Sequence, residues 1–158
     1  MVSLRQKYPL ENRKIIKKTI SRFLSSLFIV VFLGFFISFS GFYTSSIIQV
    51  ILFLLPLIFI LFYLYEYYYF KTYFYDLQGK NIVIRKGVFS ISEITLPINR
   101  LQDVYIDQDL LDRLFGLYDV HVSSATAIST FLSHIDGVNQ KNSEILKKLI
   151  LKGIHKRK

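Results

Sequence analysis

Several residue types and motifs on which catalysis commonly depends are missing from this chain of 158 residues. It has no cysteine, so it forms no disulfide, no thiolate zinc site and no thiol nucleophile. A phosphate-binding loop of the G-x-x-x-x-G-K type is also missing, and Ser123, Ser124 and Ser129 lack the glycines of a nucleophile elbow. These absences argue against the enzyme classes that are easiest to recognise in a sequence.

Charge is missing from two long apolar stretches, at about residues 23–39 and 47–62. A helix rises about 1.5 Å per residue, so a hydrocarbon core of about 30 Å needs roughly 20 apolar residues. Both stretches approach this length, and the chain as a whole is 52% hydrophobic, which favours the membrane class. We expect two transmembrane helices forming a hairpin over residues 23–70, with only a mild kink at Pro56.

Positive charge is concentrated at the two ends of the chain. Residues 1–22 hold seven basic residues against one acid, and residues 141–158 hold seven more against one acid. The stretch 71–140 has six basic and eight acidic residues, so we expect no nucleic-acid partner, and anionic lipid explains the basic ends more simply. Because the loop at 40–46 is uncharged, the positive-inside rule places both ends of the chain in the cytoplasm.

A cleaved signal peptide is the alternative explanation of the first apolar stretch. The basic lead of 22 residues is long for a signal peptide, and no small-x-small cleavage site stands out after Phe39. A second apolar stretch also follows at once. We therefore predict a multi-pass protein of the inner (cytoplasmic) membrane, divided into a basic cytoplasmic segment 1–22, the helical hairpin 23–70 and a cytoplasmic domain 71–158.

The second apolar stretch ends among tyrosines, which suit the membrane interface because the ring is apolar and the hydroxyl is hydrated. Glu66 lies within this group. A carboxylate inside hydrocarbon would indicate a functional site, whereas one at the end of a span reaches headgroup water. We favour the interfacial position for Glu66.

Beyond residue 72 the pattern changes to short alternating strands, expected at 73–77, 81–85, 88–96, 102–107, 117–123 and 128–135. Gln78-Gly79-Lys80 supply a hairpin turn, with glycine where positive φ is needed. Pro97 ends the third strand because it has no N–H for a ladder. Asp136-Gly137 is expected to end the last one.

Two helices accompany these strands. Asp109 is a plausible N-cap and Gly116 a plausible stop for a short helix between the fourth and fifth strands. The pattern from Asn139 or Asn142 through Ile154 predicts an amphipathic helix, which either lies on the membrane or packs on the sheet. We prefer packing of Ile145–Ile150 on the sheet, with 155–158 left as a loose, lipid-attracted end. The predicted fold class is α+β, with a bent antiparallel sheet or barrel after the two transmembrane helices and a C-terminal capping helix.

Five stretches resemble the bacterial pleckstrin-homology-like domain of membrane proteins (bacterial PH type 2): 75–77, 81–87, 94–104, 108–120 and 134–138. The most specific part is LPINRLQDV followed by LLDRLFGLYDV, and the resemblance covers roughly residues 20–152. It implies a PH-like barrel with a C-terminal helix at the cytoplasmic face. It also implies work with a second PH-like membrane partner, but no defined activity, since fold alone does not give function.

Four acids, Asp103, Asp107, Asp109 and Asp112, form a dense acidic group. They do not match the calcium loop D-x-[DN]-x-[DN]-G. The pair Asp107-x-Asp109 is reminiscent of nucleotide-sugar transferases, but no large nucleotide-binding domain accompanies it. We assign these acids to helix capping and to the solvent.

The histidines at 121, 134 and 155 are far apart and follow no metal-ligand spacing. His121 alternates with apolar neighbours on its strand, so we expect its side chain to face solvent. We predict no catalytic residue, no metal and no cofactor.

Five basic residues are the candidates for contact with lipid headgroups or the membrane surface: Lys71, Lys80, Arg85, Lys86 and Arg100. Three of them lie near the first hairpin, where eukaryotic PH domains bind phosphoinositides, but the K-x(n)-[KR]-x-R spacing is not reproduced. The simpler interpretation is a solvated rim attracted to anionic headgroups, at about 1 kcal/mol per basic residue.

The sequence therefore favours a membrane-anchored PH-like interaction module without enzymatic activity. Its expected partners are membrane lipids and either a second PH-like membrane protein or another copy of itself, with strand addition at an open sheet edge as one mechanism. The alternative function is binding of anionic lipid headgroups or lipid handling, and an enzyme is the third.

Overall fold

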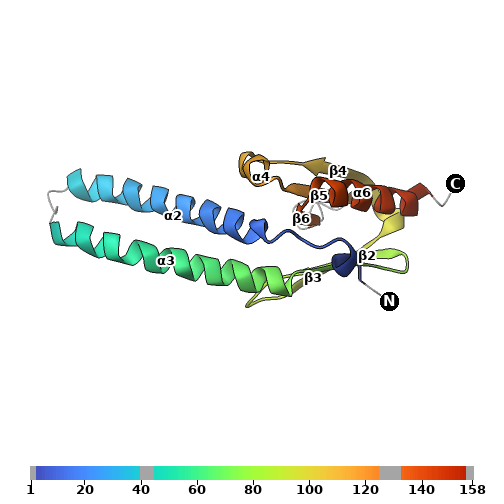
Figure 1. Cartoon of the computed structure of the whole chain (residues 1–158), viewed down its shortest axis with the longest axis horizontal. Helices are drawn as coiled ribbons and strands as arrows, with labels where there is room; N and C mark the ends of the chain where they lie inside the picture. Colours follow the sequence, from blue (N-terminus) through green and yellow to red (C-terminus); the bar gives the residue numbers. More distant parts are fainter. Residues whose placement is uncertain (1–2, 40–44, 125–132, 156–158) are drawn as a thin grey trace.

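The computed structural model describes residues 3–39, 45–124 and 133–155. Two long helices lie side by side, and two small sheets with a covering helix lie at one end of this pair (Figure 1). The chain enters at the sheet end, runs out and back through the helices, and then builds the sheets.

The two long helices are α2, Arg13–Phe39, and α3, Ser45–Thr72. Both are longer than the apolar stretches in the sequence: α2 begins ten residues before Phe23, and α3 continues through the tyrosines. Pro56 lies inside α3, which continues past it, as the sequence predicts. Both are long and apolar enough to cross a membrane over Arg13–Phe36 and Phe53–Thr72, and only 6% of each apolar window is buried.

A short helix that the sequence pattern did not reveal precedes them. This helix, α1, covers Leu4–Lys7 and begins with a capping box between Ser3 and Gln6. It packs against the first strand, where the Leu4 N–H donates to the Asp76 carboxylate at 2.9 Å. The N-terminal segment is thus part of the folded structure.

The first sheet has the order β1-β2-β3 and is antiparallel throughout. Its strands are Phe74–Gln78, Asn81–Lys86 and Ser92–Pro97. The turn at Gly79 has φ +60, which confirms the predicted hairpin. The third strand begins four residues later than expected and includes Pro97 as its last residue.

The second sheet has the order β4-β5-β6. A 3-10 turn, η1 (Ile98–Arg100), leads into β4 (Leu101–Asp107), and α4 (Leu110–Phe115) separates it from β5 (Tyr118–Ser124). Asp109 caps α4 and Gly116 ends it in the left-handed conformation, as predicted. The last strand, β6, covers His134–Val138, so Asp136-Gly137 lies within it. Residues 128–132 of the expected strand lie outside the described part of the chain.

The hydrophobic core lies between the two sheets and under the last helix, α6 (Gln140–His155). Ile82 and Ile84 enter it from the first sheet, and Val120 and Val122 from the second. Alternation along each strand directs these β-branched side chains to one face. Leu146 and Ile150 of α6 are fully buried, and α6 packs on β4 and β5 of the second sheet, which confirms the predicted packing of this helix.

The sequence left open one bent sheet or a barrel, and the described strands form neither a single sheet nor a closed barrel. The described strands form two separate three-stranded sheets, β1-β2-β3 and β4-β5-β6, without a ladder between them. The strands separate into two sheets at the η1 turn, which connects β3 to β4. After this turn β4 pairs with β5 in the second sheet and not with β3. The α+β class and the C-terminal helix are confirmed.

Candidate functional site at the junction of helices and sheets

The first turns of α2 bring lysines against the second sheet. Lys17 and Lys18 follow Lys14 by three and four residues, a spacing that places their side chains next to that of Lys14 on the helix surface. Lys14 and Lys17 are buried, at 1% and 3% relative exposure. Lysine is rarely buried without a partner, so each requires a matching charge from the sheets.

The partner of Lys14 is Asp136 on β6. The ammonium lies 2.9 Å from the Asp136 carboxylate, and both side chains are nearly inaccessible, at 2% and 5% exposure. Lys18 approaches the other carboxylate oxygen at 3.4 Å. Burial opposes ionisation of Asp136, but the charges of Lys14 and Lys18 outweigh it and hold its pKa below the usual range.

Gly137 makes this close approach possible. A Cβ at this position would lie 2.6 Å from Cδ of Lys14, and its φ of +80 is unfavourable for other residues. The Lys14 ammonium also lies 4.0 Å from the centre of the Tyr73 ring, a cation–π contact. The lysine is therefore enclosed by the start of the first sheet and the last strand of the second.

The partners of Lys17 belong to α4. Its ammonium lies 2.5 Å from Asp112 and 3.0 Å from Asp109, which are also the two members of the capping box of that helix. Asp112 is 1% exposed at its side chain and Asp109 is 60% exposed. The capping role predicted for these acids is confirmed, whereas the expected solvent exposure of Asp112 is wrong, because Lys17 covers it.

A third charged contact joins the two long helices. The Arg22 guanidinium donates to the Glu66 carboxylate, and Glu66 is 3% exposed while Arg22 is 48% exposed. The hydration expected for Glu66 is wrong, because protein atoms cover its carboxylate, while its interfacial depth stays a prediction. The Arg22 guanidinium also lies 4.9 Å from the Tyr65 ring.

Lys86 on β2 and His134 on β6 lie close to the ion pair of Lys14 and Asp136. The Lys86 ammonium is 3.5 Å from Nε2 of His134. Burial lowers the pKa of Lys86 to about 8 and that of His134 to about 4. In both groups the negative charge of Asp136 opposes the effect of burial. His134 is therefore neutral at pH 7, and its backbone carbonyl accepts a hydrogen bond from the Tyr73 hydroxyl at 2.6 Å.

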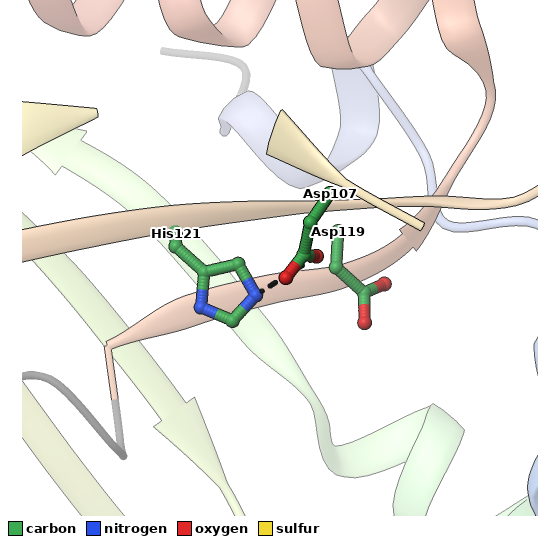
Figure 2. Close-up of side chains that lie close together, drawn as sticks. All are labelled: Asp107, Asp119 and His121. Atoms are coloured by element: carbon green, nitrogen blue, oxygen red, sulfur yellow. Dashed lines mark hydrogen bonds and ion pairs between the residues drawn. The ribbon is translucent and has the colours of Figure 1, made fainter. Parts of the chain in front are cut away.

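Asp107, Asp119 and His121 meet on the exposed face of the β4–β5 pair (Figure 2). Each offers an oxygen or nitrogen within 4.8 Å of the others. Asp107 is hydrogen-bonded to Nε2 of His121 at 3.2 Å, and Asp119 accepts from the Gly137 N–H at 2.7 Å. Since each group already has a protein partner, the spacing alone does not indicate a cation.

The surroundings of two of these groups differ from expectation. His121 is 20% exposed at its side chain and stacks between the rings of Tyr105 and His134, at 4.8 and 5.3 Å, and does not project freely into solvent. Burial, with the nearby charges of Asp136 and Asp112, raises the pKa of Asp119 to about 6.

The five basic residues predicted from the sequence do not form one site. Lys71 and Arg85 are exposed at the end of the first sheet that adjoins α3. Arg85 pairs with Phe74 of the neighbouring strand, and its guanidinium lies over the Phe74 ring. Lys80 and Arg100 are exposed at the opposite end, where the Ile98 N–H donates to the Lys80 carbonyl. Lys86 is 7% exposed, which leaves its ammonium directed at His134 rather than at a membrane. Lipid contact at the four exposed residues stays a prediction.

The residues that sequence reasoning missed are Lys14, Lys17 and Asp136. Their signal is weak, because lysines at this spacing before an apolar stretch are also typical of a solvated, positive-inside flank. The partner acids follow about a hundred residues later in the chain. An Asp-Gly pair inside a strand, where a turn is expected, was the one local indication.

Comparison with known proteins supports the fold and its family. The family model described as "Bacterial PH domain" matches residues 25–154, which includes most of α2, all of α3 and both sheets. No curated protein and no solved structure gave a match. Since the matched region covers far more than half of the sequence, the chain belongs to the bacterial PH domain family.

Proposed function

We propose that the chain is a two-span membrane protein whose PH-like module lies in the cytoplasm and assembles with another membrane protein or a second copy. In this proposal α2 and α3 cross the inner membrane. Support comes from their outward apolar side chains, such as Phe28 at 72% and Phe53 at 80% exposure, because patches of this size are rarely left in water. The uncharged connection at 40–46 favours both termini in the cytoplasm.

The observation that carries the assembly proposal is the unequal covering of the sheet edges. The β1 edge is packed by α1, and β6 accepts a backbone hydrogen bond from the Glu11 N–H at its Gly137 carbonyl, 2.8 Å away. Within the described residues, β3 receives no such backbone bond from outside its own sheet, and β4 makes one only at its first residue, where the Leu101 N–H donates to the Ile98 carbonyl of η1. An edge with unpaired N–H and C=O groups is a template for an added strand.

Of these two edges, β3 is the better candidate. Ser92, Glu93 and Thr95 are exposed, whereas Leu96 is buried toward the core. A partner strand would therefore meet polar side chains on the outer face and main-chain groups along the edge. Binding would gain its affinity from main-chain hydrogen bonds. The module needs no catalytic group for this role.

The test is photocrosslinking in native membranes with a photoreactive residue at Thr95, compared with one at Lys148. Lys148 is exposed on α6, which packs mainly on β4, β5 and η1 rather than on β3, and is the matched control for the β3 edge. We expect Thr95 to give a discrete crosslinked product, identified by mass spectrometry, that Lys148 does not. Equal, diffuse crosslinking at both positions would contradict the proposal.

A second candidate function, binding of an anionic lipid, is favoured by one specific feature. A groove of about 460 Å³ lies between the start of α2 and the end of α3. Arg13 and Lys71 supply its positive charge, while Ile16, Tyr63 and Tyr67 supply an apolar wall. This combination suits a phosphate headgroup with an attached acyl chain.

Co-purified lipid distinguishes this second function. Protein extracted in mild detergent is expected to retain an anionic phospholipid that the variant Arg13→Ser with Lys71→Ser loses. The matched control is Lys80→Ser with Arg100→Ser, which changes the same charge at the opposite end of the first sheet. Equal lipid retention in all three proteins would remove the lipid-binding function and leave assembly unaffected.

A further inference from the structure

The four most exposed large apolar side chains after residue 72, within the described residues, occupy two tips of the module. Phe89 is 93% and Ile91 is 64% exposed in the β2–β3 connection, and Leu110 is 80% and Leu114 is 78% exposed on α4. Single exposed apolar residues are common on protein surfaces. Two pairs, one from each sheet, are a more specific arrangement.

The first tip is folded back along α3. The Phe89 ring lies 6.2 Å from the ring of Tyr65, and the Thr72 hydroxyl donates to the Gly87 carbonyl at 2.6 Å. A Cβ at Gly87 would lie 1.9 Å from the Ser90 carbonyl oxygen, at a φ of +130. The connection is therefore tightly turned, and its turn keeps Phe89 beside the helix.

The second tip is fixed to α2 by charge. Leu110 and Leu114 are four residues apart and share one face of α4. Asp109 and Asp112 of the same segment bind the Lys17 ammonium, which holds α4 beside the first turns of α2. Arg113, between the two leucines in sequence, is exposed.

Both tips lie at nearly the same level of the helical pair. Tyr65, the neighbour of Phe89, is next to Glu66, whose partner is Arg22 on α2. Lys17 precedes Arg22 by five residues, which is about 7.5 Å along a helix. Figure 1 shows α4 and the β2–β3 connection at the end of the sheets that faces the long helices. This is the level at which tyrosine and charged residues replace the purely apolar sequence of both helices.

We infer that the two tips seat the PH-like module on the cytoplasmic leaflet, with Phe89 and Ile91 entering it on one side of the helical pair and Leu110 and Leu114 on the other. The occupant of this surface is the boundary between headgroups and acyl chains, which accepts exposed aromatic and aliphatic side chains. The inference rests on the proposed insertion of α2 and α3. It adds that the module has a fixed orientation, in which the β3 edge stays free for a partner.

The absence of tryptophan from the chain allows a direct test. Full-length variants with one tryptophan each, Phe89→Trp and Leu114→Trp, are reconstituted into bilayers with lipids brominated near the headgroup end of the acyl chain. We expect both tip tryptophans to lose about half or more of their emission, as groups at the acyl boundary do. Lys148→Trp, on the exposed face of α6, is expected to keep its emission.

A further variant, Phe32→Trp in the apolar part of α2, is reconstituted with lipids brominated near the terminal methyl group of the acyl chain, because Phe32 lies near the middle of the apolar stretch, and it separates the two proposals. Quenching of Phe32→Trp without quenching at either tip would overturn the seat while leaving membrane insertion intact. No quenching at Phe32→Trp would overturn the insertion itself. A blue-shifted, unquenched tip tryptophan would also overturn the seat, because protein rather than lipid would then cover it. If a tryptophan variant does not fold, Phe89→Cys and Leu114→Cys carrying a spin label report the same depth, since the chain has no cysteine.

Discussion

The two sheets are attached to the helical pair in different ways. The first sheet continues directly from α3 and is held by rings, with Tyr69, Tyr73 and Tyr75 forming a chain of aromatic contacts at about 6 Å between centres. The second sheet does not follow α2 directly in the sequence, and two lysines of α2, Lys14 and Lys17, hold it to that helix. Aromatic packing is tolerant of small changes, whereas a buried ion pair is sensitive to the loss of either partner.

This difference suggests a division of roles. The aromatic attachment joins neighbouring segments of the chain, so it depends on few long-range contacts. The charged attachment joins α2 to β6 and α4, about a hundred residues apart, so it depends entirely on long-range contacts. The ion pairs of α2 therefore determine the position of the second sheet. This sheet also carries α4 and the cluster of Asp107, Asp119 and His121.

The largest expected effect comes from breaking the charged attachment. Lys14→Met leaves the buried Asp136 without its main partner, and removal of one member of a buried pair costs about 3–5 kcal/mol. We expect the free energy of unfolding in detergent micelles, followed by tyrosine fluorescence, to fall by this amount. Lys18→Met is the control, because Lys18 is 34% exposed and 3.4 Å from Asp136, and should cost less than about 1 kcal/mol.

The double variant Lys14→Met with Asp136→Asn sharpens this result. It removes the uncompensated charge, so it should be more stable than Lys14→Met alone. Equal stability of the single and double variants would show that the loss comes from packing around Gly137 rather than from the unpaired carboxylate. Equal losses in Lys14→Met and Lys18→Met would contradict the difference in burial on which the comparison stands.

The sequence predicted the parts of this architecture that repeat locally. Two apolar helices, the hairpin at Gly79, the Asp109 cap and the amphipathic stripe of α6 all follow from spacing within a few residues. The choice between a bent sheet and a barrel stayed open in the sequence because no local pattern states whether β4 pairs with β3 or crosses to a new sheet. The β3 boundary was set too early because Phe89 and Ile91 alternate like strand residues but lie in the connection.

The candidate site was less accessible for a physical reason. Lys14 and Lys17 look like a solvated basic flank until Asp136 and Asp112 are placed beside them, and complementary charges distant in sequence leave no periodic pattern. Lys86 looked like a surface cation for the same reason. Its alternation with Arg85 was compatible with either face of β2, and only the fold assigns it to the side of His134.

A second prediction concerns pH and the acid groups of the second sheet. The pKa of Asp119 is raised to about 6, above its unfolded value of about 3.9. The folded protein therefore binds more protons than the unfolded chain between these values. The stabilising contribution of protonated Asp119 is complete below about pH 4 and is lost as the pH rises through about 6.

Asp119→Asn cannot ionise, so its contribution to stability is not lost as the pH rises. Its amide keeps an oxygen that accepts from the Gly137 N–H. We expect it to raise the free energy of unfolding at pH 7 by about 1–2 kcal/mol, with no gain at pH 4. Unfolding titrations at both pH values check this, with Asp103→Asn, exposed on β4, as the control. A gain of equal size at both pH values would show that charge is not its origin.

A third prediction tests the hydrogen bond by which the aromatic attachment contacts β6 of the second sheet. Tyr73 is fully buried and its hydroxyl donates to the His134 carbonyl. Tyr73→Phe keeps the ring and removes only this bond, so the expected loss is about 1 kcal/mol in the same unfolding assay. Tyr105→Phe, which is 43% exposed, should change little. A loss at Tyr73 as large as that of Lys14→Met would mean that this single hydrogen bond is as sensitive as the buried ion pair, which contradicts the comparison.

The smallest expected effect distinguishes the two ends of the first sheet. Lys71 and Arg85 lie at the helix end, and Lys80 and Arg100 lie at the opposite end. If the proposed insertion is right, only the first pair is within reach of headgroups, where each basic residue contributes up to about 1 kcal/mol, or roughly a fivefold preference for anionic lipid. Native mass spectrometry of protein released from mixed micelles measures this preference. Lys71→Ser or Arg85→Ser should reduce it severalfold and Lys80→Ser or Arg100→Ser should not, whereas a uniform reduction in all four would mean that net charge, rather than position along the sheet, governs the contact with lipid.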